Sequence, residues 1–227
     1  MQYNINRKVN AIEAIDRGWL VVGSGVSIGE DVAFVQGDMR YRTKIGTGSS
    51  IDLGTIIYNG VSIGENTRIS SNVRIEGGCR IGSNVFVGHS TVLRPGTVIS
   101  DECTIGHLCV FEGDTVVQDN TLIHSQCHIT KGVKIGSSVF IAPLFVGAND
   151  PKMCHRRRHL IEYKETPYTI GNGVRIAIGV TLLPGVVLGD NVVVGANSLV
   201  TKSVPSNFIV RGTPAIKVGE VPEGERL

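Results

Sequence analysis

The chain of 227 residues has few aromatic residues, little net charge and no long apolar run. It contains one tryptophan, five tyrosines and six phenylalanines beside 29 glycines, a composition that does not suit one large central core. Its formal net charge of +2 gives no reason to expect nucleic-acid binding. No apolar run is long enough to cross a membrane, and the N-terminus lacks a signal-peptide pattern, so we expect a soluble, cytoplasmic protein.

What the chain does contain is a six-residue repeat that runs from Ile45 to Val146 without an insertion or deletion. Position one of every unit is large and apolar, from Ile45 through Ile141. Position five is small or β-branched until the last unit, where it is Phe145. Self-similarity at a fixed short period predicts a solenoid rather than a globule with a central core.

The positions of the unit predict its shape. In an extended segment, residues two apart share a face, so positions five and one should point inward and position six outward. Position four is dominated by residues that tolerate a positive φ angle, mainly glycine and asparagine. The turn pairs Pro95-Gly96 and Pro184-Gly185 fall in positions three and four. A short strand followed by a tight bend, repeated, predicts a polygonal coil.

The repeat stops after Val146 and resumes at Ile170. The segment between them is polar, opens with Asn149-Asp150 and contains three consecutive arginines. A long excursion from a rigid scaffold is a common place for function. The composition alone fits a solvated loop equally well.

The repeats, together with residues 170–185, 194–202 and 211–215, resemble the hexapeptide-repeat acyltransferases. The resemblance implies an all-β fold, a left-handed parallel β-helix with three hexads in each coil, so that residues eighteen apart stack on neighbouring coils. We therefore predict a single β-helix domain over residues 1–227. Its expected parts are an N-terminal cap (1–21), a first run of coils (22–146), a projecting loop (147–169), the last coils (170–204) and a C-terminal tail (205–227).

The resemblance also implies an activity. In this family a projecting loop late in the helix closes over the active site, and the coils after it bind coenzyme A between subunits. The Asn149-Asp150 pair looks most like the sugar N-acyltransferases that act on an amino sugar carried by a nucleoside diphosphate. Many O-acetyltransferases of the family have a threonine-histidine pair near this point, so O-acetyl transfer is an alternative. We expect acetyl-CoA as the acyl donor and direct attack of the sugar amine on its thioester.

Candidate catalytic residues come from the loop and from the coil before it. Asp150 is a candidate for orienting the amine or accepting its proton, and Asn149 precedes it in the pair that resembles the family. His128 lies at an outward position six among apolar neighbours. This setting favours a functional role over the interpretation of His128 as a solvated surface residue. His155 lies inside the loop. The predicted catalytic residues are therefore Asn149, Asp150, His128 and His155.

Candidate binding residues are placed by the period and by the resemblance. The acceptor is expected to contact polar residues around the loop-bearing coils, namely His107, His124, Gln126, Lys131 and Arg156. By resemblance, coenzyme A should contact Ala177, Gly179, Ala196, Thr201, Lys202 and Arg211. Backbone N–H groups at Ala177 or Gly179 are the expected donors to the thioester oxygen. This activity implies no metal site.

Outward apolar residues predict a partner surface. Position six is apolar on many coils, at Phe86, Val92, Val98, Val110, Val116, Leu122, Phe140 and Val146. Apolar stripes of this extent would be left in water by a single copy, so we expect them to be covered. By resemblance, the covered assembly is a homotrimer.

A zinc enzyme is a further alternative. Carbonic anhydrases of the gamma class share this helix and bind zinc through histidines at subunit contacts. The period stacks His89 on His107 at one bend and places His124 and His128 nearby, which keeps this interpretation open. Stacked histidines on a solenoid are equally well explained as solvated turn residues.

Other patterned residues are expected to be structural. Four of the five cysteines occupy position five, where a free thiol behaves as a compact apolar group. Glu76, Arg94 and Glu112 lie eighteen apart in one position and should form a ladder of exposed ion pairs. Ile12, Ile15 and Trp19 have helical spacing, which predicts a helix that caps the first coil.

Overall fold

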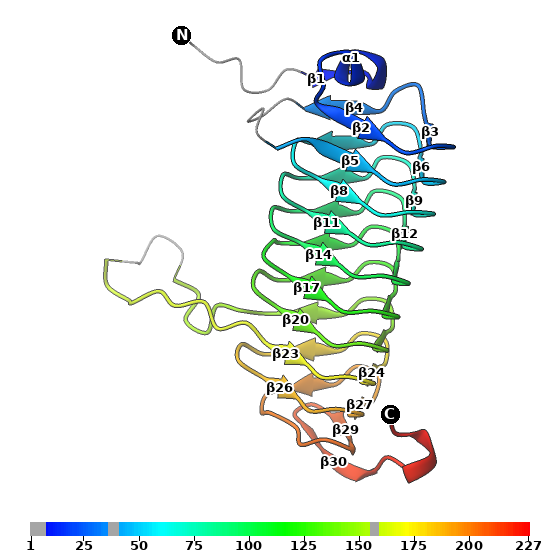
Figure 1. Ribbon diagram of the computed structural model, residues 1–227. Coiled ribbons are helices and arrows are strands. Elements are labelled where there is room, and N and C mark those ends of the chain that lie inside the picture. The colour runs from blue at the N-terminus through cyan, green and yellow to red at the C-terminus, as the bar shows by residue number, and fades with distance from the viewer. Residues whose placement is uncertain (1–7, 36–40, 155–158) are drawn as a thin grey trace.

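The computed structural model describes residues 8–35, 41–154 and 159–227. Short strands wind around one long axis and stack into three parallel walls, which gives the molecule the shape of a prism (Figure 1). The walls are sheets of 10, 9 and 11 strands, named sheets A, B and C. The predicted all-β fold, a hexapeptide-repeat parallel β-helix with three hexads in each coil, is confirmed.

Most strands are only two residues long. Sheet A consists of β1 (Lys8–Val9), β4 (Ala33–Val35), β7 (Ile56–Tyr58), β10 (Arg74–Ile75), β13 (Val92–Leu93), β16 (Val110–Phe111), β19 (His128–Ile129), β22 (Val146–Gly147), β25 (Thr181–Leu182) and β28 (Leu199–Val200). Sheet B consists of β2 (Leu20–Val22), β5 (Thr43–Ile45), β8 (Ser62–Ile63), β11 (Arg80–Ile81), β14 (Val98–Ile99), β17 (Val116–Val117), β20 (Lys134–Ile135), β23 (Thr169–Ile170) and β26 (Val187–Leu188). Sheet C consists of β3 (Ser27–Ile28), β6 (Ser50–Ile51), β9 (Arg68–Ile69), β12 (Phe86–Val87), β15 (Thr104–Ile105), β18 (Leu122–Ile123), β21 (Phe140–Ile141), β24 (Arg175–Ile176), β27 (Val193–Val194), β29 (Phe208–Gly212) and β30 (Ala215–Glu220).

The interior is filled as the six positions predict. Position-one residues such as Ile75 and Leu93 are fully buried and pair in register across neighbouring coils. Position five is buried as well, and its hydroxyls and thiols donate to backbone carbonyls of the next coil. Thr67 Oγ1 donates to the Gly82 carbonyl at 2.7 Å, and Cys103 Sγ donates to the Gln118 carbonyl at 3.1 Å. Small side chains therefore fill this position and also satisfy the corner backbone.

The tight bends at position four are confirmed by the backbone angles. Glycines there have positive φ, and so do other residues that seldom adopt this region, among them Leu108 (φ 56°) and Leu144 (φ 63°). Stacking against the coils above and below holds these corners, because a lone leucine would avoid the conformation. The repeat thus imposes its bend even on unfavourable residues.

The predicted projecting loop leaves the prism after β22 and returns at β23 (Figure 1). At the return point Tyr168 occupies the interior position five, which is small or β-branched on the coils before Phe145, and it is fully buried. Its ring lies 5.8 Å from that of Phe145, and Gly147 makes room for it at position one, where other coils have a large apolar residue. Burial raises the pKa of the Tyr168 phenol. This exchange of large and small residues keeps the interior filled where the chain leaves and rejoins the helix.

Both ends of the prism are capped. At the N-terminal end, α1 (Ala11–Asp16) begins at Asn10, whose side chain accepts the Glu13 N–H at 2.9 Å. The predicted helix is present and packs through the fully buried Ala14, whereas Ile12 is 72% exposed. At the other end, β29 and β30 form an antiparallel hairpin, followed by a 3-10 helix, η1 (Glu223–Glu225). No helix among the described residues has the length and apolarity to cross a membrane.

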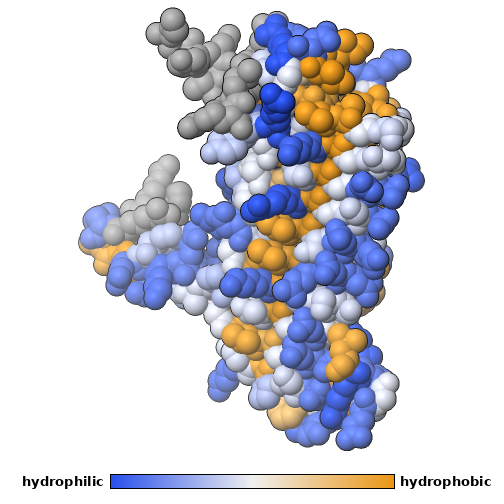
Figure 2. Space-filling model, in the orientation of Figure 1, coloured by the Kyte–Doolittle hydropathy of each residue, from blue (hydrophilic) through white to orange (hydrophobic). Residues whose placement is uncertain are grey.

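The outward apolar residues lie on all three walls. In Figure 2 an apolar surface runs along the long axis over the wall that holds β11, β14 and β17, interrupted by polar side chains. Six of the predicted outward apolar residues are half-buried on a single chain, while Phe140 and Val146 are 42% and 44% exposed. The predicted outward direction of position six is therefore confirmed.

Candidate active site

Each coil turns three corners, which stack into three edges of the prism. We name the edges by the sheets that they join: the AB edge, the BC edge and the CA edge. Residues 58–60, 76–78, 94–96, 112–114 and 130–132 are consecutive corners of the AB edge. The projecting loop also connects sheet A to sheet B, and so does the earlier interruption between β4 and β5. Both excursions from the repeat therefore leave from the AB edge.

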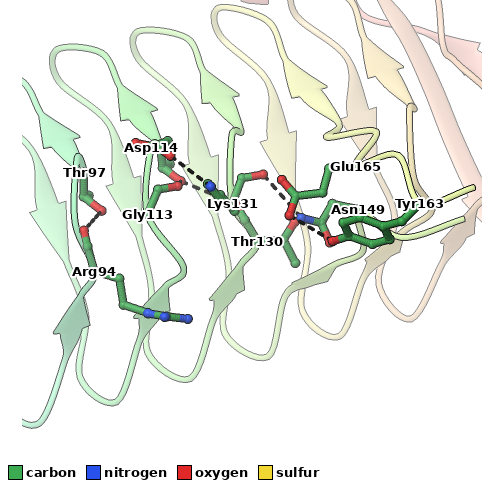
Figure 3. A network of polar contacts seen from close by, with 10 residues as sticks. Arg94, Thr97, Gly113, Asp114, Thr130, Lys131, Asn149, Tyr163 and Glu165 are labelled. Carbon is green, nitrogen blue, oxygen red and sulfur yellow. Dashed lines mark hydrogen bonds and ion pairs between the residues drawn. The ribbon is translucent and has the colours of Figure 1, made fainter. Parts of the chain in front are cut away.

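A hollow of about 320 Å³ lies on the AB edge where the projecting loop begins. The corners contribute Arg94, Glu112, Asp114 and Lys131 to its wall, and the loop contributes Asn149, Tyr163 and Glu165. Figure 3 shows Asp114, Lys131, Asn149 and Glu165 following one another along this edge. Of the residues predicted from sequence, Lys131 and Asn149 thus meet in one place.

Short polar contacts tie the loop to the corners. Lys131 Nζ lies 3.3 Å from Asp114 Oδ2, and Asn149 Nδ2 donates to the Lys131 carbonyl at 3.5 Å. Within the loop, the Tyr163 hydroxyl donates to Glu165 Oε1 at 2.9 Å. The hollow therefore presents an ammonium, an amide and carboxylates, which are groups that can hydrogen-bond a polyhydroxylated ligand.

His128 lies beside this hollow on the outer face of sheet A. Its Nε2 is 3.1 Å from Glu112 Oε1, and Glu112 is part of the wall of the hollow. Val110 and Val146 stand above and below it in the same ladder, so the imidazole is half-buried between apolar neighbours. A histidine held by a carboxylate is the arrangement of an oriented general base.

The Asp150 carboxylate organises the start of the loop. Its oxygens accept the backbone N–H groups of Lys152 at 2.9 Å, Met153 at 2.9 Å and Cys154 at 3.0 Å. This pattern is a local turn that fixes the course of the chain after Asn149. These contacts favour a role for Asp150 in positioning the loop over the two predicted roles, which were orienting the amine or accepting its proton.

The other predicted acceptor contacts lie on the far edge of sheet A. His107, His124 and Gln126 belong to the CA edge, where the rings of His89 and His107 stack with centroids 5.0 Å apart. The stacking is as predicted, and each ring accepts a backbone N–H through Nδ1, from Ser71 at 3.2 Å and from His89 at 2.9 Å. These two histidines therefore cap corners. His128 stands between this edge and the hollow.

The predicted cofactor residues are also divided between two edges. Ala177, Gly179, Ala196 and Arg211 follow one another on the CA edge, whereas Thr201 and Lys202 form an AB corner beyond the loop. On a single chain these residues do not form one continuous surface.

The expected oxyanion donors are wrong. The Ala177 N–H donates to the Val194 carbonyl at 2.9 Å, and the Gly179 N–H donates to the Pro143 carbonyl at 3.1 Å, so both are used by the ladder between coils. The Ile178 N–H between them has no acceptor among the described residues. A donor at this corner is displaced by one residue from the predicted ones.

The predicted ion-pair ladder on the AB edge is wrong as well. Glu76 pairs with Arg74 Nε at 2.8 Å, and Glu112 pairs with His128. Each of these two carboxylates thus pairs with a position-six side chain on a neighbouring strand of sheet A, and not with Arg94. Arg94 has no ion pair within the described part of the chain, and Figure 3 shows its guanidinium turned away from the other contacts.

Some site residues were outside the reach of sequence reasoning. Tyr163 and Glu165 belong to the loop, where no period places a residue in space. The spacing of eighteen residues placed Glu112 and Arg94 on neighbouring coils, but it did not predict which side chains they contact. The predicted His155 and Arg156 lie outside the described residues. No cluster of three or more His, Cys, Asp or Glu side chains that could hold a metal occurs among the residues described.

Comparison with solved structures shows a shared fold. The UDP-N-acetylglucosamine acyltransferase of Arabidopsis is 20% identical with a TM-score of 0.62, and the match covers 89% of this chain and 70% of that one. The enzyme of the same name from Campylobacter jejuni is 16% identical with a TM-score of 0.58, over 89% of this chain and 71% of that one. The N-acyltransferase AntD from Bacillus cereus, in complex with dTDP and coenzyme A, is 18% identical over 96% of this chain and 93% of its own. Its TM-score of 0.36 is too low to place those ligands on this chain.

Family models match coils on both sides of the loop. Residues 73–106 match the hexapeptide repeat of succinyl-transferase, and residues 167–202 match the bacterial transferase hexapeptide model of six repeats. No curated protein sequence matches the chain. The matched segments are stacked coils of one β-helix, so both models match hexapeptide repeats of the transferase type on this chain.

Proposed function

We propose that this acyltransferase transfers an acetyl group from acetyl-CoA to the amino group of a nucleotide-linked amino sugar. One observation carries the proposal: His128 is held by Glu112 at 3.1 Å beside the polar hollow at the start of the loop. A thioester is already electrophilic, so an amine needs orientation, a proton acceptor and a donor to the carbonyl oxygen. This pair and this hollow supply the first two.

In the proposed reaction the unprotonated amine attacks the thioester carbonyl carbon and forms the C–N bond. His128 takes a proton from the nitrogen, and Glu112 holds the imidazole in place. The C–S bond then breaks, and the thiolate of coenzyme A takes up the proton as it leaves. No covalent acyl-enzyme is needed, and general-base catalysis of this kind contributes roughly 10²–10⁴-fold to the rate.

The acceptor sugar is proposed to lie in the hollow on the AB edge. Asn149 and Glu165 offer an amide and a carboxylate to its hydroxyl groups, and Lys131, bound to Asp114, closes the wall. Asp150 is assigned to holding the loop rather than to chemistry.

Acetyl-CoA is proposed to approach His128 from the CA edge. Ala177, Gly179 and Ala196 keep that edge shallow, and the Ile178 N–H is an open donor for the thioester oxygen. Lys202 lies on the AB edge, so it can contact the same coenzyme A molecule only if a neighbouring copy brings the two edges together. A homotrimer with the donor between copies is therefore part of the proposal. Light scattering should give three times the mass of the 24.3 kDa chain, and a monomer would contradict this arrangement.

The function is tested by offering a panel of nucleotide-linked amino sugars with acetyl-CoA and monitoring free thiol. We expect at least one amine acceptor to raise thiol release well above the rate of thioester hydrolysis. The same panel with hydroxyl acceptors separates O-acetyl transfer, and hydration of carbon dioxide with stoichiometric zinc separates the gamma-class carbonic anhydrase alternative. Thiol release that no amine accelerates, together with zinc-dependent hydration, would overturn the proposal.

A further inference from the structure

A second hollow adjoins the first along the AB edge. It has a volume of about 330 Å³ and is lined by Tyr41, Asn59, Gly60, Gly77 and Gly78. Its lower corner is 76–78 and the upper corner of the first hollow is 94–96, so the two hollows meet at consecutive coils. Stacked corners are spaced by about 4.8 Å, the separation of paired strands. The two hollows therefore follow one another along this edge, and we refer to them together as the AB groove.

The upper end of this groove suits a flat ring. Tyr41 is 61% exposed and stands directly over Gly60, where any added Cβ would lie 3.1 Å from the Cβ of Tyr41. The floor continues over Gly78, where an added Cβ would meet nothing within 4 Å. An exposed aromatic ring beside an open glycine floor is a surface on which a planar base can stack.

The middle of the groove carries an unused positive charge. Arg94 lies on the corner where the hollows meet, and its guanidinium is exposed and has no ion pair within the described part of the chain. The nearest carboxylates along the edge are already engaged, Glu76 with Arg74 and Glu112 with His128. A guanidinium without a carboxylate partner is suited to a phosphate group.

Backbone donors lie along the same edge, one coil before and two coils after this arginine. The N–H groups of Gly77 and Lys131, at position three of their corners, have no acceptor among the residues described. On the BC edge the same position is capped, as where Asp101 Oδ1 accepts the Ser83 N–H at 2.7 Å. Open N–H groups on both sides of a cation favour anion binding.

We propose that this groove binds the nucleoside diphosphate of the acceptor, with the base on Tyr41 and the diphosphate on Arg94. The sugar then extends toward the loop and places its amine near His128 and Glu112. The order of groups in the groove, a ring surface, a cation and a polar hollow, matches the order of base, diphosphate and sugar in such a ligand. This inference rests on the proposed function and adds the half of the site that recognises the nucleotide.

The test is calorimetric titration of the full chain with UDP and dTDP, and with inorganic pyrophosphate, in the absence of acetyl-CoA. Tyr41→Ala should weaken binding of the nucleoside diphosphates at least about fivefold but leave pyrophosphate unchanged, and Tyr41→Phe should keep wild-type affinity. Arg94→Ala should weaken both kinds of ligand by about tenfold or more. Arg80→Ala removes an exposed arginine from the face of sheet B and is the matched control. Thermal melting of each variant shows whether it is folded.

The outcomes separate this inference from the proposed function. If amino sugars are acylated but UDP and dTDP neither bind nor inhibit, the groove proposal is overturned while acyl transfer stands. Equal losses in Arg80→Ala and Arg94→Ala would also overturn it. If nucleoside diphosphates bind with the expected pattern but no amino sugar is acylated, the groove proposal is supported and the proposed reaction fails.

Discussion

The AB and BC edges are built from the same repeat, yet they differ in whether side chains cap the backbone N–H groups of their corners. On the BC edge, the position-three N–H groups of Glu65, Ser83 and Asp101 each donate to a side chain of the next coil, at 3.1, 2.7 and 3.1 Å. On the AB edge, position three is Gly77, Pro95, Gly113 and Lys131 on consecutive coils, and none of these caps the coil before it. The identity of the position-three residue therefore decides whether the backbone N–H groups of an edge are capped by side chains or are available to a ligand.

The largest expected effect is on kcat and concerns His128, which lies on the outer face of sheet A beside the AB edge. Replacing His128 with alanine should lower kcat by roughly 10²–10⁴-fold, because the amine then loses its proton acceptor. The half-buried ring is not part of the interior, so the melting temperature should change little. Steady-state thiol release measures the effect, with Lys134→Ala, an outward residue on sheet B, as the control. A loss of less than about threefold would remove His128 from the mechanism.

The second prediction concerns the interior packing behind the AB edge, where the loop returns to the helix. Gly147→Ala would place a methyl group into the buried ring of Tyr168, so the free energy of unfolding should fall by about 1–3 kcal/mol or more. Gly219→Ala on β30 is the control, since its added Cβ would be 3.9 Å from the nearest atom, Ile209 Cδ1. Urea unfolding compares the two variants. Equal stabilities would mean that the return of the loop does not depend on this packing.

The third prediction contrasts the two edges directly. Asp101→Ala removes the cap of the Ser83 N–H and should lower the free energy of unfolding by about 1 kcal/mol with kcat unchanged. Lys131→Ala on the AB edge should do the reverse, raising KM for the acceptor severalfold with little change in stability, because its exposed pair with Asp114 contributes little to folding. A kinetic effect at Asp101 that matched the one at Lys131 would erase the distinction between the edges.

The smallest effect concerns the interior, which is expected to be alike behind both edges. Cys79 donates to the carbonyl of Arg94 on the AB edge and Cys103 to that of Gln118 on the BC edge, and burial raises the pKa of each thiol to about 11. Since the pKa is higher in the folded chain than its ordinary value of 9.0, each thiol stabilises the fold fully below pH 9 and loses that effect as the pH rises through 11.

This alkaline loss is measurable. The free energy of unfolding of the wild-type chain should decline between pH 9 and 11, and Cys79→Thr and Cys103→Thr should each remove a share on the order of 1 kcal/mol. Threonine occupies the same position on other coils, so the substitution keeps the interior filled. A decline that is the same in both variants and in the wild type would contradict the assignment.

The fold was predictable because the repeat has a fixed period of six residues without insertions. A period of six with stacking at eighteen fixes which residues point inward, and the φ angles at position four follow from the bends that close each coil. The site was less predictable because it depends on side-chain reach across positions. Glu112 lies in a column of alternating charge, but the shorter path to His128 on the adjacent strand decides its partner.

The loop marks the limit of sequence reasoning. Asn149 was placed by its position eighteen residues after Lys131, whereas Tyr163 and Glu165 belong to no period and could be located only by folding the chain. Asp150 was recognised as important by resemblance, yet its three backbone contacts are a turn that composition does not reveal.

The central claim is that an amine in the AB groove attacks the thioester with His128 as its base. Its most direct test is the initial rate of coenzyme A release with one nucleotide-linked amino sugar and with the matching sugar that carries a hydroxyl in place of the amine. The account predicts rapid release with the amine, none above hydrolysis with the hydroxyl, and loss of the amine-dependent rate in His128→Ala. Equal or faster release with the hydroxyl, or an amine-dependent rate that survives in His128→Ala, would contradict it.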